Sequence, residues 1–287
     1  MSCYCPFLMP VFLRIMSFPG ALSIGLSQLF TYILGMLLIL FPTFALIKPE
    51  RGQNNTMTIG IINAMQKEHA QIAALLQDAQ VTRDGHLAFT TGTYNGKQLV
   101  LMQSGIGKVN AAVGAVELIR RFAPDILVNT GVAGGIDASL DVMDVVVGAQ
   151  VAYHDVDCGP ESDPGQVQGL PAVFEADKGL LGIASALSTS TRIVPGLICS
   201  GDQFITDRQQ LSSIKTRFPQ GMAVDMESGA LAQVCHLYGV PFLSFRIISD
   251  TPGAEGHYDQ YVNFWDTMAE RSFGVTRTLL DAITTQL

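Results

Sequence analysis

Two carboxylates stand one residue apart in the stretch Ala223-Val224-Asp225-Met226-Glu227-Ser228, at the expected junction of a strand and a helix. In an extended backbone, side chains two positions apart share a face, and a helix N-terminus favours negative charge. Each carboxylate can accept hydrogen bonds from two adjacent hydroxyl groups, which suits a ribose ring. The pair therefore indicates a sugar site, although Asp225 or Ser228 can equally serve as a helix cap.

A further acidic residue, Asp250, follows the apolar strand expected over Phe242–Ile248. A carboxyl group that emerges from a buried strand can have a raised pKa and act as a general acid, or it can cap the next turn. Arg246 lies inside the same apolar strand and requires a buried acidic partner. Glu68 falls in the first turn of a predicted helix, where Glu is also common because of the helix dipole.

Two glycine-rich segments also follow predicted strands, where open α/β sheets place their ligands. Ser104-Gly105-Ile106-Gly107-Lys108 can bring backbone N–H groups to a ligand, but it is neither a P-loop nor a full dinucleotide motif. Thr130–Gly135 is rich in small residues that allow close approach by a sugar or a base. A tight turn in the first segment, and close helix–sheet packing in the second, explain them equally well.

The elements that must position these residues alternate between strand and helix, which predicts a three-layer α/β/α domain. Asn95-Gly96 between two apolar segments predicts a β-hairpin, so the central sheet should be mixed. The pattern from residue 57 to residue 287 contains no repeat and predicts one domain. The expected strands are 58–63, 86–94, 98–103, 125–129, 144–151, 192–200 and 242–248, and the expected helices are 64–77, 108–121, 177–187, 208–218, 227–238 and 261–285.

The composition excludes several classes of partner. With 287 residues and a formal net charge of -8, the chain lacks the clustered Lys and Arg that a nucleic-acid surface needs. Its five cysteines form neither a disulfide framework nor a CxxC metal motif, which favours a reducing, cytoplasmic environment. A small, uncharged or zwitterionic metabolite suits this charge balance better than a polyanion.

Residues 1–56 differ in character from the rest of the chain. No charged residue occurs between Ala21 and Ile47, and Leu29–Ile47 is close to the roughly 20 apolar residues that span a bilayer. We expect either a membrane anchor, with association through residues 21–47, or a misassigned start codon upstream of Met57. The positions of the flanking Arg and Lys residues weakly favour a cytoplasmic location for the catalytic domain. Pro49–Thr56 resembles a linker.

Taken together, the segments after Met57 resemble the 5′-methylthioadenosine/S-adenosylhomocysteine nucleosidases of the purine nucleoside phosphorylase superfamily. Single motifs are weakly specific, but seven of them occur in the family's order across nearly all of residues 57–287. The matching segments are Ile59–Met65 leading to Glu68, Ser104–Val109, Asn129–Gly135, Tyr153–Asp157, Ser200–Ile205, Ala223–Glu227 and Ser249-Asp250. The resemblance implies a nucleoside phosphorylase-like fold and the hydrolysis of the glycosidic bond of an adenine nucleoside.

The resemblance also implies roles for individual residues. Asp250 would protonate N7 of adenine and accept from its exocyclic amine, Glu68 would be the general base on water, and Glu227 would hold the ribose hydroxyls. Phe204 would stack on the base, and Arg246 would order the acidic cluster and the water. The remaining residues expected to bind substrate are Met65, Ile106, Ile205, Asp225, Met226 and Ser249.

Cofactor and metal are not expected, and the implied partner is a second copy of the chain in a homodimer. Tyr153-His154-Asp155-Val156-Asp157 looks like a metal-binding cluster, but the resemblance places this segment near the subunit interface. The chain departs from close relatives at Asp225, which is often Glu, and at Val132, which is often Ser. The segment 158–170 departs more strongly, which leaves contacts from a partner subunit to the 5′ group open.

Three alternatives stand beside this interpretation. A phosphorolytic purine or methylthioadenosine phosphorylase would need a phosphate pocket rich in donors, where the negative charge of Glu68 is unfavourable. A hydrolase of an aminofutalosine-type nucleoside would use the same adenine and ribose contacts. A non-catalytic, membrane-linked nucleoside-binding module would use residues 1–56. The sequence does not rank methylthioadenosine, adenosylhomocysteine and 5′-deoxyadenosine as substrates, because they differ only at the 5′ group.

Overall fold

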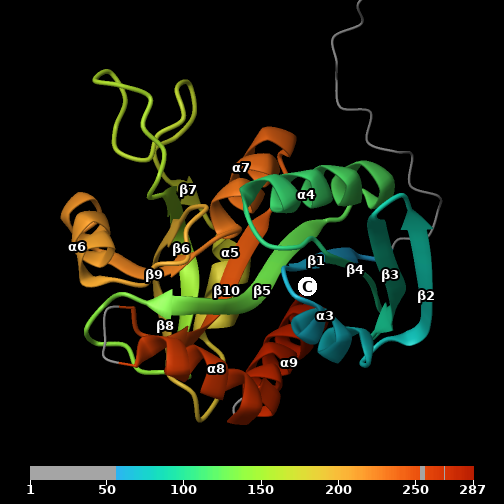
Figure 1. Ribbon diagram of the computed structural model, residues 1–287. Coiled ribbons are helices and arrows are strands. Elements are labelled where there is room, and N and C mark those ends of the chain that lie inside the picture. Colours follow the sequence, from blue (N-terminus) through green and yellow to red (C-terminus); the bar gives the residue numbers. More distant parts are fainter. Residues whose placement is uncertain (1–55, 253–255, 268) are drawn as a thin grey trace, which may run out of the picture. The chain divides into compact units, whose positions relative to one another are not determined.

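The computed structural model describes residues 56–252, 256–267 and 269–287 (Figure 1). The membrane anchor predicted at residues 21–47 therefore lies outside the described part of the chain. Among the described residues, no helix is long and apolar enough to cross a membrane.

The first half of the sheet is built around the buried strand β1 (Thr58–Asn63). It pairs in parallel with β4 (Lys97–Gln103) on one side and with β5 (Ile126–Gly135) on the other. Beyond β4, the antiparallel strands β3 (Leu87–Tyr94) and β2 (Gln77–Asp84) complete this side of the sheet. The β3–β4 turn at Asn95-Gly96 has positive φ at both residues, so the predicted hairpin is confirmed.

The second half of the sheet closes on itself (Figure 1). From β5 the order runs through β10 (Phe242–Asp250), β6 (Val145–Tyr153), β8 (Ile193–Ser200) and β9 (Gly221–Asp225), and β9 pairs with β5 again. The short β7 (Phe174–Glu175) pairs with β6. Parallel and antiparallel pairs occur together, so the prediction of a mixed central sheet is confirmed. The ring brings the ends of β5, β9 and β10 side by side.

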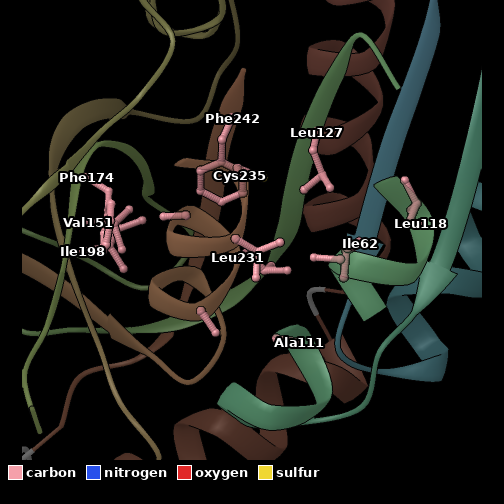
Figure 2. Close-up of a cluster of buried hydrophobic side chains, with 14 of the residues drawn as sticks. Ile62, Ala111, Leu118, Leu127, Val151, Phe174, Ile198, Leu231, Cys235 and Phe242 are labelled. Atoms are coloured by element: carbon pink, nitrogen blue, oxygen red, sulfur yellow. The ribbon is translucent and has the colours of Figure 1, made fainter. Parts of the chain in front are cut away.

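Helices cover both faces of the sheet. One face carries α4 (Lys108–Phe122) and α7 (Ser228–Tyr238), which pack against each other. The other carries α3 (Gln66–Ala73), α5 (Lys178–Ser185), α8 (His257–Thr267) and α9 (Ala269–Gln286), while α6 (Arg208–Arg217) follows β8. Figure 2 shows the apolar core on the α4 and α7 side, to which Ile62, Leu118 and Leu231 belong.

Burial on both faces explains why β1 could be predicted from its sequence. Ile59 and Ile61 point into the core beneath α3 and α9, whereas Ile62 points toward α4 and α7. A strand covered on both faces reads as a continuous apolar segment rather than as an alternation. The same pattern marks the middle of β5, β6 and β10.

Several predicted boundaries were wrong. Thr130–Gly135 is not a turn but the second half of β5, because β9 and β10 supply hydrogen-bond partners to this end of the strand. Ser249 and Asp250 belong to β10 for the same reason. The single closing helix expected over 261–285 is two helices, α8 and α9. Helix α3 ends at Ala73, and the polar, fully exposed strand β2 was missed.

Candidate active site

A pocket that is open to solvent lies where α3 begins and where β5, β9 and β10 end. Its wall brings together every residue that the sequence nominated for the site, although these residues come from segments far apart in the chain. They are Met65, Glu68, Ile106, Phe204, Ile205, Asp225, Met226, Glu227, Arg246, Ser249 and Asp250. The individual roles assigned to them stay predictions.

Arg246 is the centre of the site's electrostatics. Its side chain is 1% exposed, and its Nη2 lies 2.5 Å from Oδ2 of Asp225 and 3.6 Å from Oε2 of Glu227. The prediction that Arg246 requires a buried acidic partner is confirmed. A guanidinium in a dry interior loses its hydration, so nearby carboxylates are needed to offset that cost.

Gly131 explains how the guanidinium fits beside the sheet. It lies opposite Arg246 in the β5–β10 register. A Cβ atom at residue 131 would lie 2.7 Å from Nη1 of Arg246 and 2.8 Å from Oε1 of Glu68, too close for either contact. The space left by this glycine is therefore filled by Arg246 and Glu68, rather than by a sugar or base as one interpretation of the sequence supposed.

Glu68 lines the pocket, and two backbone N–H groups hold its carboxylate. Met65 N donates to its Oε2 at 3.1 Å, and Val132 N donates to its Oε1 at 3.3 Å. The first bond is part of a capping box at the start of α3, so the helix-start interpretation of Glu68 also holds. Burial raises the pKa of Glu68, and the positive charge of Arg246 opposes that rise. A carboxylate of this kind is suited to accept a proton.

Glu227 is oriented by the glycine-rich turn at 104–108. Gly107 adopts a φ of 95°, which favours glycine, and its N–H donates to Oε1 of Glu227 at 3.0 Å. The next N–H, of Lys108, donates to Oδ1 of Asp202 at 2.7 Å. The turn at the start of α4 thus binds carboxylates of its own chain. Burial raises the pKa of Glu227 to about 7.

Asp225 has the capping role that the sequence left open. Its Oδ2 accepts from the backbone N–H of Ser228 at 3.0 Å and from the Ser228 hydroxyl at 2.5 Å, at the first residue of α7. The same oxygen contacts Arg246. Asp225 therefore joins the start of α7 to the guanidinium while also lining the pocket.

Asp250 ends β10 and is 2% exposed. The Ser249 hydroxyl donates to its Oδ1 at 2.7 Å, which fixes the orientation of the carboxyl group. A carboxyl in this position is directed by a rigid strand rather than by a loop. It lies in the same pocket as Glu68 and Glu227, which start two different helices.

The mouth of the pocket is aromatic. Phe204 is 42% exposed and makes an edge-to-face contact with Tyr261 of α8, with ring centroids 5.4 Å apart. The Tyr261 hydroxyl lies 3.8 Å from the sulfur of Met65. Ile106 is 53% exposed and adds apolar surface to the same wall. An exposed ring beside an apolar wall offers a planar base a stacking partner.

The comparisons with known proteins agree with this geometry. Residues 58–281 match the model of the phosphorylase superfamily. The chain is 41% identical to the 5′-methylthioadenosine/S-adenosylhomocysteine nucleosidase of Lysinibacillus sphaericus over 214 residues, which are 72% of this chain and 92% of the relative. This chain belongs to the 5′-methylthioadenosine/S-adenosylhomocysteine nucleosidases. The prediction from ordered motifs, an α/β hydrolase of the glycosidic bond in this family, is confirmed.

Solved structures of similar nucleosidases include complexes with small molecules. The enzyme from Colwellia psychrerythraea, in complex with adenine, is 38% identical with a TM-score of 0.74, covering 79% of this chain and 96% of that one. The enzyme from Neisseria meningitidis, in complex with methylthio-immucillin-A, is 36% identical with a TM-score of 0.74, covering 78% and 98%.

The nucleosidase pocket also contains residues that the sequence did not nominate. Tyr261 was assigned to a helix, but nothing local indicated that α8 would bring it over the pocket. Val132, noted only as a departure, lines the wall, and its backbone N–H contacts Glu68. The other missed lining residues are Ala64, Ala133, Gly134, Gln203, Val224 and Pro252.

The segment that looked like a metal cluster has other partners in this nucleosidase. Asp155 pairs with Nζ of Lys108 at 2.9 Å and accepts from the backbone N–H of Asp202 at 2.9 Å. The Tyr153 hydroxyl donates to Gln233 at 2.8 Å. Across the described ranges, no group of three or more His, Cys, Asp or Glu side chains is arranged to hold a metal ion.

Proposed function

We propose that this nucleosidase hydrolyses 5′-methylthioadenosine and S-adenosylhomocysteine, and also 5′-deoxyadenosine, with Glu68 as general base and Asp250 as general acid. The observation that carries the proposal is the buried Glu68 carboxylate, held by Met65 N and Val132 N beside Arg246. A base fixed in this way can take a proton from a water molecule that attacks the sugar.

The proposed chemistry follows from the bond that breaks. The leaving adenine carries away the bonding electrons, so the sugar becomes positively charged and the purine must be neutralised. Asp250 donates a proton to N7 of adenine, and Glu68 removes a proton from the attacking water. Each such proton transfer contributes about 10²–10⁴-fold to the rate. Carboxylates near the sugar stabilise the positive charge that develops there.

Substrate binding is assigned to the remaining wall residues. In the proposal Glu227 accepts hydrogen bonds from the ribose hydroxyls, while Met226 packs against the sugar. Phe204 stacks on adenine, and the backbone of Ile205 bonds its edge. The apolar 5′ substituent lies against Met65 and Ile106, and Tyr261, which contacts Met65, extends the same wall.

The charges of the pocket favour water over phosphate as the nucleophile. Arg246 is the only Lys or Arg among the described lining residues, and it already contacts Asp225 and Glu227. A phosphate dianion placed near Glu68 would meet a carboxylate without a spare cation to balance it. A phosphorolytic enzyme needs the opposite arrangement.

Replacing Glu68 with Gln tests the proposal. The amide keeps the size of the side chain but cannot accept a proton, so we expect adenine nucleosides to bind with nearly unchanged affinity while kcat falls about 10²–10⁴-fold. Calorimetric binding of a non-hydrolysable nucleoside and single-turnover adenine release measure the two effects. Full turnover by Glu68→Gln would contradict the assignment, and a wild type that binds without turnover would indicate a nucleoside-binding module.

We also propose a homodimer formed through α4. Val109 and Val113, one helical turn apart, are 74% and 41% exposed, and Ile106 lies just before the helix. Exposed apolar side chains grouped along one helix are typical of protein–protein contacts. We expect Val109→Lys to shift the sedimentation coefficient toward the monomer, whereas Val81→Lys on the exposed strand β2 should not. Identical sedimentation of wild type and Val109→Lys would contradict an interface at α4.

The catalytic unit is proposed to be residues 57–287, acting in the cytoplasm. The described residues that line the pocket all lie between Ala64 and Tyr261. If residues 1–56 are part of the working protein, they would tether this unit to the inner face of the membrane. Fractionation of cells that express the full chain or residues 57–287 alone distinguishes the two cases: only the full chain should sediment with membranes if the tether is real.

A further inference from the structure

We propose that Asn129 is a positioning residue for hydrolysis: it fixes the guanidinium of Arg246 so that its charge serves both Glu68 and Glu227. This proposal rests on the proposed function, in which those two acids act on water and ribose. Asn129 does not line the pocket, and its side chain is fully buried within β5. The sequence placed Asn129 at the end of a strand and at the start of one matching segment, but gave it no role.

The contacts of Asn129 join two parts of the site. Its Oδ1 accepts a hydrogen bond from Nη2 of Arg246, and its Nδ2 donates to the backbone carbonyl of Ile62 at 2.9 Å. Ile62 belongs to β1, which leads directly into α3 and Glu68. Asn129 therefore fixes the guanidinium relative to the strand that positions the proposed base.

The same face of β5 also supplies the space for the guanidinium. Residues two apart on a strand point to the same side, so Asn129 and Gly131 both face Arg246, which pairs with Gly131 in register. The amide accepts from one end of the guanidinium, and the missing side chain at Gly131 accommodates Nη1 beside Glu68. Ser228 supplies a second neutral acceptor, with its Oγ 3.3 Å from Nε.

A neutral acceptor matters because the guanidinium already faces three acids. Asp225 approaches from β9, Glu227 from the start of α7 and Glu68 from α3. Burial raises the pKa of Glu68 and of Glu227, and the positive charge of Arg246 partly offsets each rise. An amide oxygen orients the guanidinium without adding a further negative charge that would oppose ionisation of the two acids.

The test uses Asn129→Leu, which removes the acceptor, and Asn129→Asp, which keeps its volume but adds a negative charge. Both changes weaken the support that Arg246 gives to ionised Glu68 and Glu227. We expect the acid limb of the pH profile of kcat/KM to move up by about one pH unit, with kcat at neutral pH reduced about tenfold. Affinity for a non-hydrolysable adenine nucleoside should change less than kcat does.

Asn63→Leu is the matched control. Asn63 is also fully buried on a neighbouring strand, and its Nδ2 donates to Oγ1 of Thr130 at 2.7 Å. Its substitution should reduce the thermal midpoint but leave the acid limb in place. If the two Asn129 variants keep the wild-type acid limb, or if Asn63→Leu shifts it equally, Asn129 has only a structural role and the proposal is overturned.

The volume-conserving Asn129→Asp variant decides the question if Asn129→Leu does not accumulate as folded protein. The proposed function is tested separately, by measuring adenine release by the wild-type protein in phosphate-free buffer. Wild type that releases no adenine there contradicts the proposed function, whereas active wild type with an unmoved acid limb in the variants contradicts only the role of Asn129.

Discussion

Replacing Gly131 with Ala places a methyl group between the proposed base and the cation that supports it. The new Cβ would lie 2.7 Å from Nη1 of Arg246 and 2.8 Å from Oε1 of Glu68, where ordinary contact begins at 3.4 Å. Each group must therefore retreat by roughly 0.6 Å. The backbone of Gly131 is regular strand, so alanine meets no φ strain, and the effect comes from space alone.

The size of the effect follows from how strictly hydrolysis depends on position. A displacement of about 1 Å in a reacting group can cost about 10²-fold in rate, so a shift of this size should lower kcat/KM by roughly 10- to 100-fold. Overpacking a buried site also costs about 1–3 kcal/mol of stability. Adenine release from methylthioadenosine and thermal unfolding measure the two effects on the same preparation.

Gly60→Ala provides the comparison for this variant. A Cβ at residue 60 would lie 2.9 Å from Cδ2 of Leu118, the flexible end of an aliphatic side chain on the α4 face. This substitution should lower the thermal midpoint without lowering the activity of the folded enzyme. Wild-type kcat/KM in Gly131→Ala, or an equal loss of activity in Gly60→Ala, would refute the reasoning.

Two further predictions concern the other acids. Asp250→Asn should lower kcat about 10²–10⁴-fold for methylthioadenosine, but much less for a riboside whose leaving group needs no proton. Equal losses of kcat on both substrates would contradict the role of Asp250 as a general acid. Burial raises the pKa of Glu227 from 4.5, the value of the exposed group, to about 7 in the folded state. The protonated Glu227 therefore contributes its full stabilisation below about pH 4.5, and this stabilisation is lost as the pH rises through about 7. Denaturant unfolding should therefore show wild type losing stability relative to Glu227→Gln between these pH values, and a constant difference would contradict the burial argument.

The parts of the fold that could be predicted are those whose local chemistry agrees with their tertiary setting. Strand β1 is apolar because both faces are buried, and the Asn95-Gly96 turn has the positive φ angles that its residue types favour. Strand β2 could not be predicted, because its polar, exposed residues show no periodicity and pairing with β3 alone makes it a strand.

The same distinction applies to the site. Asp225, Glu227 and Asp250 could be nominated because they occur in segments that match the nucleosidase family in order, although capping alone could explain Asp225 or Asp250. Asn129 and Tyr261 could not be, because the partner of each lies far away in the sequence: Arg246 for the amide and Phe204 for the ring. Their positions depend on strand pairing and helix packing, which no local pattern encodes.

In the proposed function, water activated by Glu68 breaks the glycosidic bond without phosphate. Adenine release from methylthioadenosine in phosphate-free buffer, measured on residues 57–287 beside the full chain, tests it most directly. We predict that both proteins release adenine and 5-methylthioribose in equal amounts, at rates that added phosphate does not raise. Strict dependence on phosphate, with a sugar 1-phosphate as the second product, would contradict the claim.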